Sequence, residues 1–215
     1  MLLEPFVTFG EFDGGFSEEF VDLLPRRLKK FPRCLSVRIL VRKHLHCSPV
    51  LVSGSCEICA VDLFASGAQL RLLACYLPPM TCSSENGIAV MTEFIGVRDA
   101  VLHSDATIIC CGDFNLPNID WSSLCCPTSH TYGDGSKKEI FLDFILLSGL
   151  VQLVSGPTHR DGNTLDLIFS NDEDAVLDLE TVPAPVRSDH LGLAFWVPFI
   201  SAPSTLRSSP HPLSH

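Results

Sequence analysis

The chain has 215 residues, of which 46% are hydrophobic and 19% are charged, which is enough apolar material for one large domain with a buried core. Its 25 acidic residues outnumber its 15 basic ones, so the formal net charge at pH 7 is −10. This balance argues against general electrostatic attraction to nucleic acid, which needs a basic face. A nuclease stays open, because a divalent metal can compensate the charge of a cleft lined with carboxylates.

Signals for secretion or membrane insertion are missing from the pattern. The N-terminus has no basic segment followed by an apolar stretch, and no apolar run reaches about 18 residues. Four cysteines, Cys59, Cys75, Cys110 and Cys111, lie inside apolar runs, where free cysteine behaves as a small hydrophobic residue. We therefore expect a reduced intracellular protein, nuclear or cytoplasmic and not secreted, with no membrane contact and no evident protein partner.

The first 34 residues form a divergent N-terminal segment, acidic up to Asp22 and basic over residues 26–30. Glycine and proline residues interrupt any long periodic pattern in it. We expect one folded domain over residues 35–200. The Ser/Pro-rich residues 201–215 are expected to be a disordered tail.

Within the domain, hydrophobic periodicity predicts both strands and helices. Short alternating or continuous apolar runs predict strands over 36–41, 57–64, 70–76, 107–111, 151–154, 164–169 and 191–197. Apolar residues at helical spacing predict helices over 85–102 and 137–147, the second ending at Gly149 in a left-handed cap. Strands on both sides of two helices, joined by hairpins as well as crossovers, indicate a mixed α/β arrangement.

Two polar side chains follow the apolar strand 107–111, just beyond Gly112. In extended backbone, alternate residues point to the same side. Asp113 and Asn115 would then face one cleft while Phe114 enters the core. The alternative is a polar turn that only caps a core strand.

Further polar residues occur within or at the ends of other apolar strands, namely Tyr76, Asp166, and Asp189 with His190. An ionised aspartate inside a strand such as 164–169 is costly unless it is paired or binds a metal. A histidine is the natural partner, because the carboxylate orients its ring and raises its pKa. The alternative is that Asp166 faces solvent from an edge strand.

Taken in order, these segments resemble one known family. The motifs are Tyr-Leu-Pro-Pro at 76–79, Cys-Gly-Asp-Phe-Asn-Leu-Pro-Asn-Ile-Asp-Trp at 111–121, Pro-Thr-His-Arg-Asp-Gly-Asn-Thr-Leu-Asp-Leu-Ile at 157–168 and Ser-Asp-His at 188–190. Over about residues 35–200 the chain resembles the endonuclease/exonuclease/phosphatase superfamily, specifically the endonuclease domain of non-LTR (LINE-type) retrotransposon polyproteins.

The resemblance implies a four-layered α/β sandwich, with two facing mixed sheets, outer helices and an active site at one open edge. It also implies DNA nicking by a hydrolase that uses Mg²⁺, or Mn²⁺ as an alternative. Asp113 would orient or deprotonate the attacking water, and Asn115 would hold the water and the phosphate. His190, oriented by Asp166, would contact the scissile phosphate.

Two further roles follow from the resemblance: Tyr76 would donate to a phosphate oxygen, and Asp189 would bind the metal. Members of this family also begin with a strand ending in Asn and a second strand carrying a metal-binding Glu. This chain has no clear equivalent of either, and Glu4 is the candidate for the missing ligand. We therefore expect a fold incomplete at the N-terminus and weakened DNA cleavage. An inactive retrotransposon remnant and a phosphatase or phosphoinositide-type phosphoesterase of the same fold remain alternatives.

Overall fold

A computed structural model describes residues 2–3, 20–23, 37, 39–50, 57–65, 67–77, 79, 91–92, 94–96, 106–124, 137–184 and 188–198. Three features expected from the sequence lie outside these residues: the candidate ligand Glu4, the basic run 26–30 and the tail from residue 201. No helix in the described part of the chain has the length and apolar character needed to cross a membrane.

A mixed six-stranded sheet forms the centre of the fold, in the order β4-β5-β6-β7-β9-β8. Its strands are β4 (His46–Val50), β5 (Glu57–Ala65), β6 (Ala68–Tyr76), β7 (Thr107–Asp113), β8 (Val151–Gln152) and β9 (Asp166–Ser170). β6 and β7 are parallel, and the other neighbouring pairs are antiparallel. The predicted mixed α/β arrangement is confirmed.

Two smaller groups of strands accompany the central sheet. β1 (Leu2–Leu3), β11 (Leu191–Pro198) and β10 (Leu177–Pro183) form a sheet in the order β1-β11-β10. β2 (Phe20–Leu23) pairs with β3 (Ile39–Arg42). Short strands of the segment 1–34 thus pair with other strands: residues 2–3 pair with β11, and residues 20–23 pair with β3 in the predicted strand 36–41.

The helical part of the fold is smaller. α2 spans Lys137–Ser148, and a 3-10 turn η2 spans Glu173–Ala175. Residues 91–92 and 94–96 are helical and fall within the predicted helix 85–102, whose other residues are outside the described set. Gly149 follows α2 at φ +70°, the left-handed conformation predicted for its cap.

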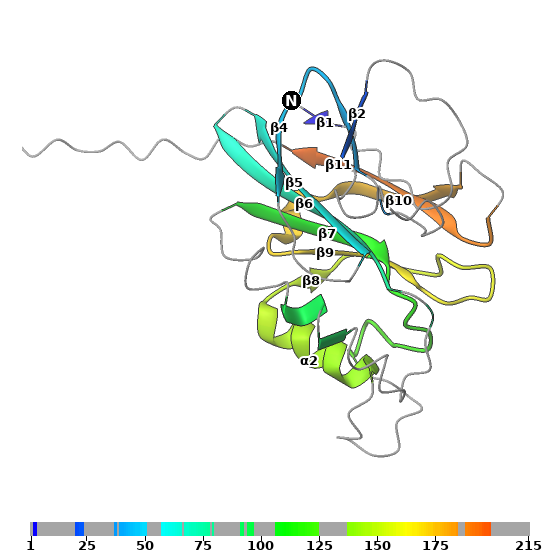
Figure 1. Ribbon diagram of the computed structural model, residues 1–215. Helices are drawn as coiled ribbons and strands as arrows, with labels where there is room; N and C mark the ends of the chain where they lie inside the picture. The colour runs from blue at the N-terminus through cyan, green and yellow to red at the C-terminus, as the bar shows by residue number, and fades with distance from the viewer. Residues whose placement is uncertain are drawn as a thin grey trace, which may run out of the picture.

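The two faces of the central sheet bury different partners, because successive side chains of a strand point to opposite sides. On one face, Phe141, Phe144 and Ile145 of α2 pack against the sheet. On the other face, Phe195 of β11 and Ile39 of β3 cover it. Figure 1 shows the resulting order of helix, sheet and second strand layer. An outer helix layer beyond β10 and β11 is not among the described residues, so the four-layered sandwich stays a prediction.

Four described strands were not predicted from the sequence: β1 and β2 within the segment 1–34, and β4 and β10 within the domain. β4 contains Pro49, and none of its residues is fully buried. β10 is mostly exposed, and its pairing with β11 shifts register between Leu177 and Glu180. Both strands hold few buried apolar residues, and burial is the signal that periodicity detects.

Candidate active site

The site lies at the end of the central sheet where β6 and β7 finish and β9 begins. Tyr76 at the end of β6 pairs in register with Asp113 of β7, and Asp113 pairs in turn with Asp166 of β9. Cys111 packs in the cluster shared with β3 and β11, and Asp113 follows two residues later on the same face. The polar residues therefore point toward the second strand layer, where His190 immediately precedes β11.

Gly112 allows β6 and β7 to approach closely beside the site. A Cβ at this position would lie 2.8 Å from Cys75 Sγ and 2.9 Å from the Cys75 carbonyl carbon, and closer still to the carbonyl oxygen. Backbone atoms cannot move aside as a flexible side chain can, so any side chain at residue 112 would separate the two strands. Glycine is required here by space, while its φ is ordinary.

Asn115 holds the carboxylate of Asp113 from the turn that follows β7. Its backbone N–H donates to Asp113 Oδ1 at 3.0 Å, and its Nδ2 donates to Asp113 Oδ2 at 2.9 Å and to the Leu77 carbonyl at 2.8 Å. Asn115 has φ +47°, so the predicted extended backbone is wrong at this residue. The two side chains nevertheless meet, and Phe114 is fully buried as expected.

The carboxylates of Asp113 and Asp166 oppose each other across two antiparallel strands and are 7% and 4% exposed. Burial raises the pKa of Asp113 to about 6, the negative charge of Asp166 adds to this effect, and the hydrogen bonds from Asn115 oppose it. Like charges directly opposite each other destabilise a sheet. A carboxyl group poised near neutral pH is typical of a functional site.

His190 is the partner that the buried Asp166 requires. Its Nδ1 lies 2.8 Å from Asp166 Oδ2. The hydrogen bond with Asp166 raises the pKa of His190, while partial burial of the ring opposes the rise. Because Asp166 is buried, the alternative of a solvent-facing carboxylate is wrong.

Thr158 fixes the relative position of Asp166 and His190, and sequence reasoning did not single it out. Its Oγ1 accepts the backbone N–H groups of Leu165 and Asp166, both at 2.9 Å, and its carbonyl accepts the N–H of Leu191 at 2.7 Å. The side chain is fully buried. Only its place in the motif 157–168, directly after Pro157, could have drawn attention to it, because a threonine in a polar loop otherwise predicts no burial.

The remaining predicted residues lie at the margin of this group. Tyr76 is partly buried against the cluster shared with β3 and β11. Asp189 is exposed, and its side chain contacts the loop before β9. Its Oδ2 lies 3.5 Å from His159 Nε2 and 3.7 Å from the guanidinium of Arg160. A hydrogen bond from its own backbone N–H lowers the pKa of Asp189, and the charge of Arg160 adds to this.

Two groups of described residues have the ligand chemistry and spacing for a metal ion. One is Asp113, Asp166 and His190, and the other is His159, Asp189 and His190, with one ligand atom from each residue within 4.8 Å of the others. In the first group, two buried carboxylates carry facing negative charges that a divalent cation would compensate. Together with the exposed carboxylate of Asp189 next to His190, the site thus offers the oxygen ligands that a hard divalent ion prefers.

This sheet, with an aspartate–histidine pair and a second buried carboxylate at its edge, defines a protein of the endonuclease/exonuclease/phosphatase class. Residues 70–194 match the family described as endonuclease-reverse transcriptase. The chain belongs to this family. All the predicted site residues except Glu4 lie within the matched region, and the resemblance inferred from the motifs is confirmed.

Solved structures of this class share the fold. The endonuclease domain of TRAS1, a telomere-specific non-LTR retrotransposon, is 18% identical with a TM-score of 0.54, over 75% of this chain and 71% of that chain. D. rerio TDP2 complexed with single-strand DNA product is 11% identical with a TM-score of 0.52, over 83% and 76%. The human Nocturnin catalytic domain with bound sulfate is 15% identical with a TM-score of 0.50, over 82% and 70%. Comparison with curated proteins finds no match.

Proposed function

We propose that this chain is a divalent-metal-dependent endonuclease that cleaves phosphodiester bonds of DNA, with Mg²⁺ as the ion and Mn²⁺ as an alternative. The observation that carries the proposal is the buried group of Asp113, Asp166 and His190. It joins a carboxyl group with a pKa of about 6 to a histidine held at 2.8 Å by a second carboxylate. A base that titrates near the working pH and a cationic donor opposite it are what in-line hydrolysis requires.

Asp113 is the proposed general base. Near neutral pH its carboxylate is largely ionised, and it would accept the proton of a water molecule as that water attacks phosphorus. Asn115 fixes the orientation of this carboxylate through its backbone N–H and its Nδ2. Both hydrogens of the Asn115 amide are engaged, so its Oδ1 is the atom we assign to holding the water.

His190 is the proposed donor to the phosphate. Asp166 occupies its Nδ1, so Nε2 carries the proton that reaches a phosphate oxygen. The hydrogen bond with Asp166 raises the pKa of His190, which favours the cationic ring where negative charge develops on that oxygen. Tyr76, next to Asp113 in register, would donate a second hydrogen bond to the phosphate through its hydroxyl.

The proposed metal would bind beside these groups, held by Asp189 and by a glutamate such as Glu4, as the family resemblance suggests. Asp189 adjoins His190 in one cluster, which supports a place for the ion close to the bound phosphate. A divalent ion bound there would polarise the phosphate and neutralise its negative charge. Glu4 remains a sequence-based candidate.

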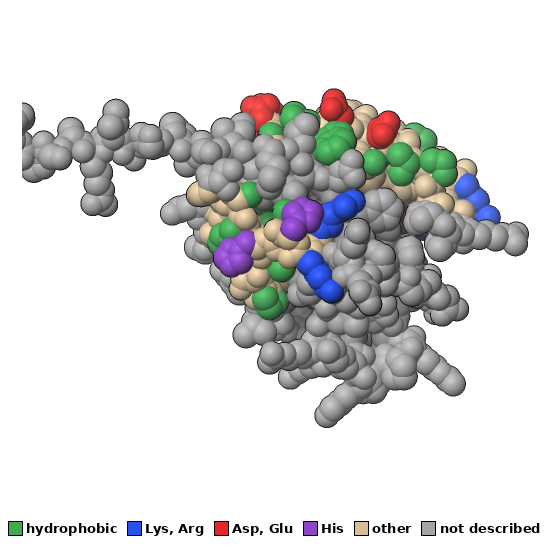
Figure 2. Space-filling model, turned by 90° about the horizontal axis from the view of Figure 1, so that it is seen from above, with side chains coloured by type: hydrophobic (Ala, Val, Ile, Leu, Met, Phe, Trp, Pro, Cys, Tyr) green, Lys and Arg blue, Asp and Glu red, His purple; other side chains and the backbone are tan. Residues whose placement is uncertain are grey.

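DNA is the proposed substrate because a retrotransposon endonuclease domain and a nuclease-fold protein with a DNA product share this fold. On the face seen in Figure 2, acidic side chains lie along one rim, and the basic and histidine side chains lie apart from them. In keeping with the net charge of −10, we expect contacts at the site to provide much of the affinity. General attraction to the phosphate backbone should contribute less.

Nicking of supercoiled plasmid with and without Mg²⁺ tests the proposal. We expect metal-dependent nicking by the wild type, and a loss of orders of magnitude in Asp113→Ala and in His190→Ala, as for groups that act in the transition state. Asp143→Asn, at an exposed position of α2, is the matched control and should nick at the wild-type rate. Nicking unchanged by Asp113→Ala would refute the assignment. Hydrolysis of a phosphomonoester or phosphoinositide in place of DNA would reassign the substrate, and inactivity on every substrate would identify an inactive remnant.

A further inference from the structure

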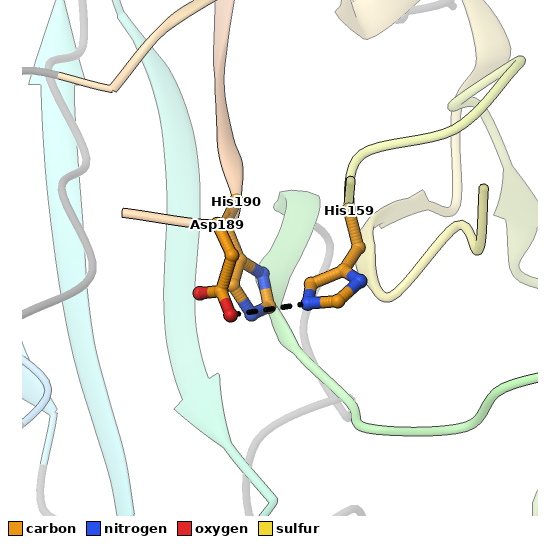
Figure 3. Close-up of side chains that lie close together, drawn as sticks. All are labelled: His159, Asp189 and His190. Carbon is orange, nitrogen blue, oxygen red and sulfur yellow. Dashed lines mark ion pairs between the residues drawn. The ribbon is translucent and has the colours of Figure 1, made fainter. Parts of the chain in front are cut away.

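A second cluster of potential metal ligands lies beside the proposed catalytic group. His159, from the loop before β9, faces Asp189 and His190, which precede β11 (Figure 3). The two imidazole rings are 4.8 Å apart between centroids and inclined at 75°. The contact drawn in Figure 3 joins His159 Nε2 to Asp189 Oδ2 at 3.5 Å.

The backbone holds these three residues together independently of their side chains. His159 and His190 form an antiparallel bridge. The N–H of Arg160 donates to the Asp189 carbonyl at 2.9 Å, and the N–H of Leu191 donates to the Thr158 carbonyl at 2.7 Å. Two loop segments joined by these backbone hydrogen bonds thus hold the ligand atoms within 4.8 Å of one another. Because the residues are already positioned, metal binding loses less conformational entropy.

The chemistry of this cluster differs from that of a magnesium site. Mg²⁺ prefers oxygen ligands, whereas two imidazoles and one carboxylate suit Zn²⁺, Co²⁺ or Ni²⁺. Ligand atoms about 2.0–2.1 Å from a tetrahedral ion lie about 3.4 Å apart. The 3.5 Å separation of His159 Nε2 and Asp189 Oδ2 is close to that spacing.

The carboxylate behind His190 supports metal coordination through Nε2 of that ring. Asp166 binds Nδ1 of His190 at 2.8 Å, the carboxylate–histidine arrangement that orients a metal-binding imidazole and increases its basicity. His159 Nδ1 accepts a hydrogen bond from the backbone N–H of Asp161 at 3.2 Å, and Asp161 Oδ2 lies 3.7 Å from the same ring nitrogen. The neutral ring therefore carries its proton on Nε2, and metal binding at Nε2 requires that proton to move to Nδ1, where the Asp161 carboxylate would replace the N–H as its partner.

One positive charge competes with a bound cation. Arg160 has its guanidinium 3.7 Å from Asp189 Oδ2, and its side chain is 71% exposed. An exposed ion pair of this kind contributes little to stability, so the arginine can turn toward solvent when a metal takes its place.

We propose that His159, Asp189 and His190 form a binding site for a borderline-soft divalent transition-metal ion such as Zn²⁺ or Co²⁺. With three protein ligands, the ion keeps a coordination position for water or a phosphate oxygen. Because Asp189 and His190 also belong to the proposed catalytic site, an ion bound here would occupy the groups that should meet the scissile phosphate.

Co²⁺ titration followed by visible absorption tests this site in the whole chain, under a phosphine reductant and without Mg²⁺, which would compete for Asp189. We expect the visible bands of tetrahedral Co²⁺ without the near-ultraviolet charge-transfer band that cysteine thiolates produce. His159→Gln should weaken binding at least tenfold, since even outer partners of metal ligands contribute 10–100-fold. Arg160→Gln, which keeps all three ligands and removes the competing charge, should strengthen it.

Circular dichroism and a thermal melt of each metal-free variant separate lost ligands from lost folding. A folded His159→Gln protein with the wild-type Co²⁺ spectrum would overturn the proposal, as would a spectrum dominated by thiolate bands or no binding by the wild type. The absorption readout involves no DNA, so the result holds whether or not the chain proves to be a nuclease.

Discussion

The facing carboxylates of Asp113 and Asp166 predict that Asp113→Asn stabilises the fold at neutral pH while abolishing cleavage. The pKa of Asp113 rises from 3.8 to about 6 on folding, a difference that corresponds to about 3 kcal/mol at about 1.4 kcal/mol for each pH unit. Between these two values the folded state keeps a proton that the unfolded state has released. The contribution of Asp113 to wild-type stability therefore falls by about 3 kcal/mol as the pH rises from about 4 to above 6.

Asparagine does not titrate, so the variant escapes this loss. It loses part of the hydrogen bonding with Asn115, however, because a side-chain amide has only one acceptor oxygen where the carboxylate has two. That loss costs about 1–3 kcal/mol and does not depend on pH. Near pH 4 the variant should therefore have a lower free energy of unfolding than the wild type. Between pH 4 and pH 7 its free energy of unfolding relative to the wild type should rise by about 3 kcal/mol.

Urea unfolding at a series of pH values, with EDTA present to remove divalent metals, measures this difference. Asp120→Asn provides a control with little pH dependence in this range. Hydrogen bonds from Ser122 and Ser123 lower the pKa of Asp120 to about 2, so its contribution to stability is present above about pH 4 and is lost only as the pH falls from there toward 2. A difference between Asp113→Asn and wild type that stays constant from pH 4 to pH 7 would refute the buried, facing arrangement of the two carboxylates.

Three further predictions concern the residues that position the site. Gly112→Ala should disrupt the β6–β7 pairing and fail to give a folded, soluble protein; a native melt for this variant would contradict the close approach of the two strands. Thr158→Val should destabilise the fold by about 2–6 kcal/mol, since two buried N–H groups lose their acceptor at about 1–3 kcal/mol each. Thr158→Ser should recover most of that loss in urea unfolding, and equal stability of the two variants would refute the role. Asp166→Asn removes the charge that raises the pKa of both Asp113 and His190, so both limbs of the cleavage–pH profile should move to lower pH; limbs that do not move would show that neither group governs the rate.

The strands that carry the site could be predicted from the sequence because they are also the core. β5, β6 and β7 are continuous or alternating apolar runs, and the predicted strands 57–64, 70–76 and 107–111 fall within their bounds. The apolar runs of β6 and β7 stop just before Tyr76 and Asp113, so polar side chains could be expected at these strand ends. β4 and β10 present little buried apolar surface, and they are defined by backbone pairing with β5 and β11, the next strands along the chain, which apolar periodicity does not detect.

The relations within the site could not be predicted from the sequence in the same way. The opposition of Asp113 and Asp166 depends on an antiparallel register between β7 and β9, which no local pattern contains. The left-handed backbone at Asn115 was missed because the alternation rule assumes an extended chain. His159 could be identified only as part of the motif 157–168 and not as a site residue, because its proximity to His190 depends on a bridge between two loops.

The most direct test of the account is a double-mutant comparison of DNA cleavage. Under saturating Mg²⁺, single-turnover nicking is measured for wild type, Asp113→Ala, His190→Ala and the double variant. Groups that act as one unit on the same phosphate give grossly non-additive losses, so the double variant should cleave about as slowly as either single variant. Losses that multiply in the double variant would show that Asp113 and His190 act independently, and the single active site described above would be contradicted.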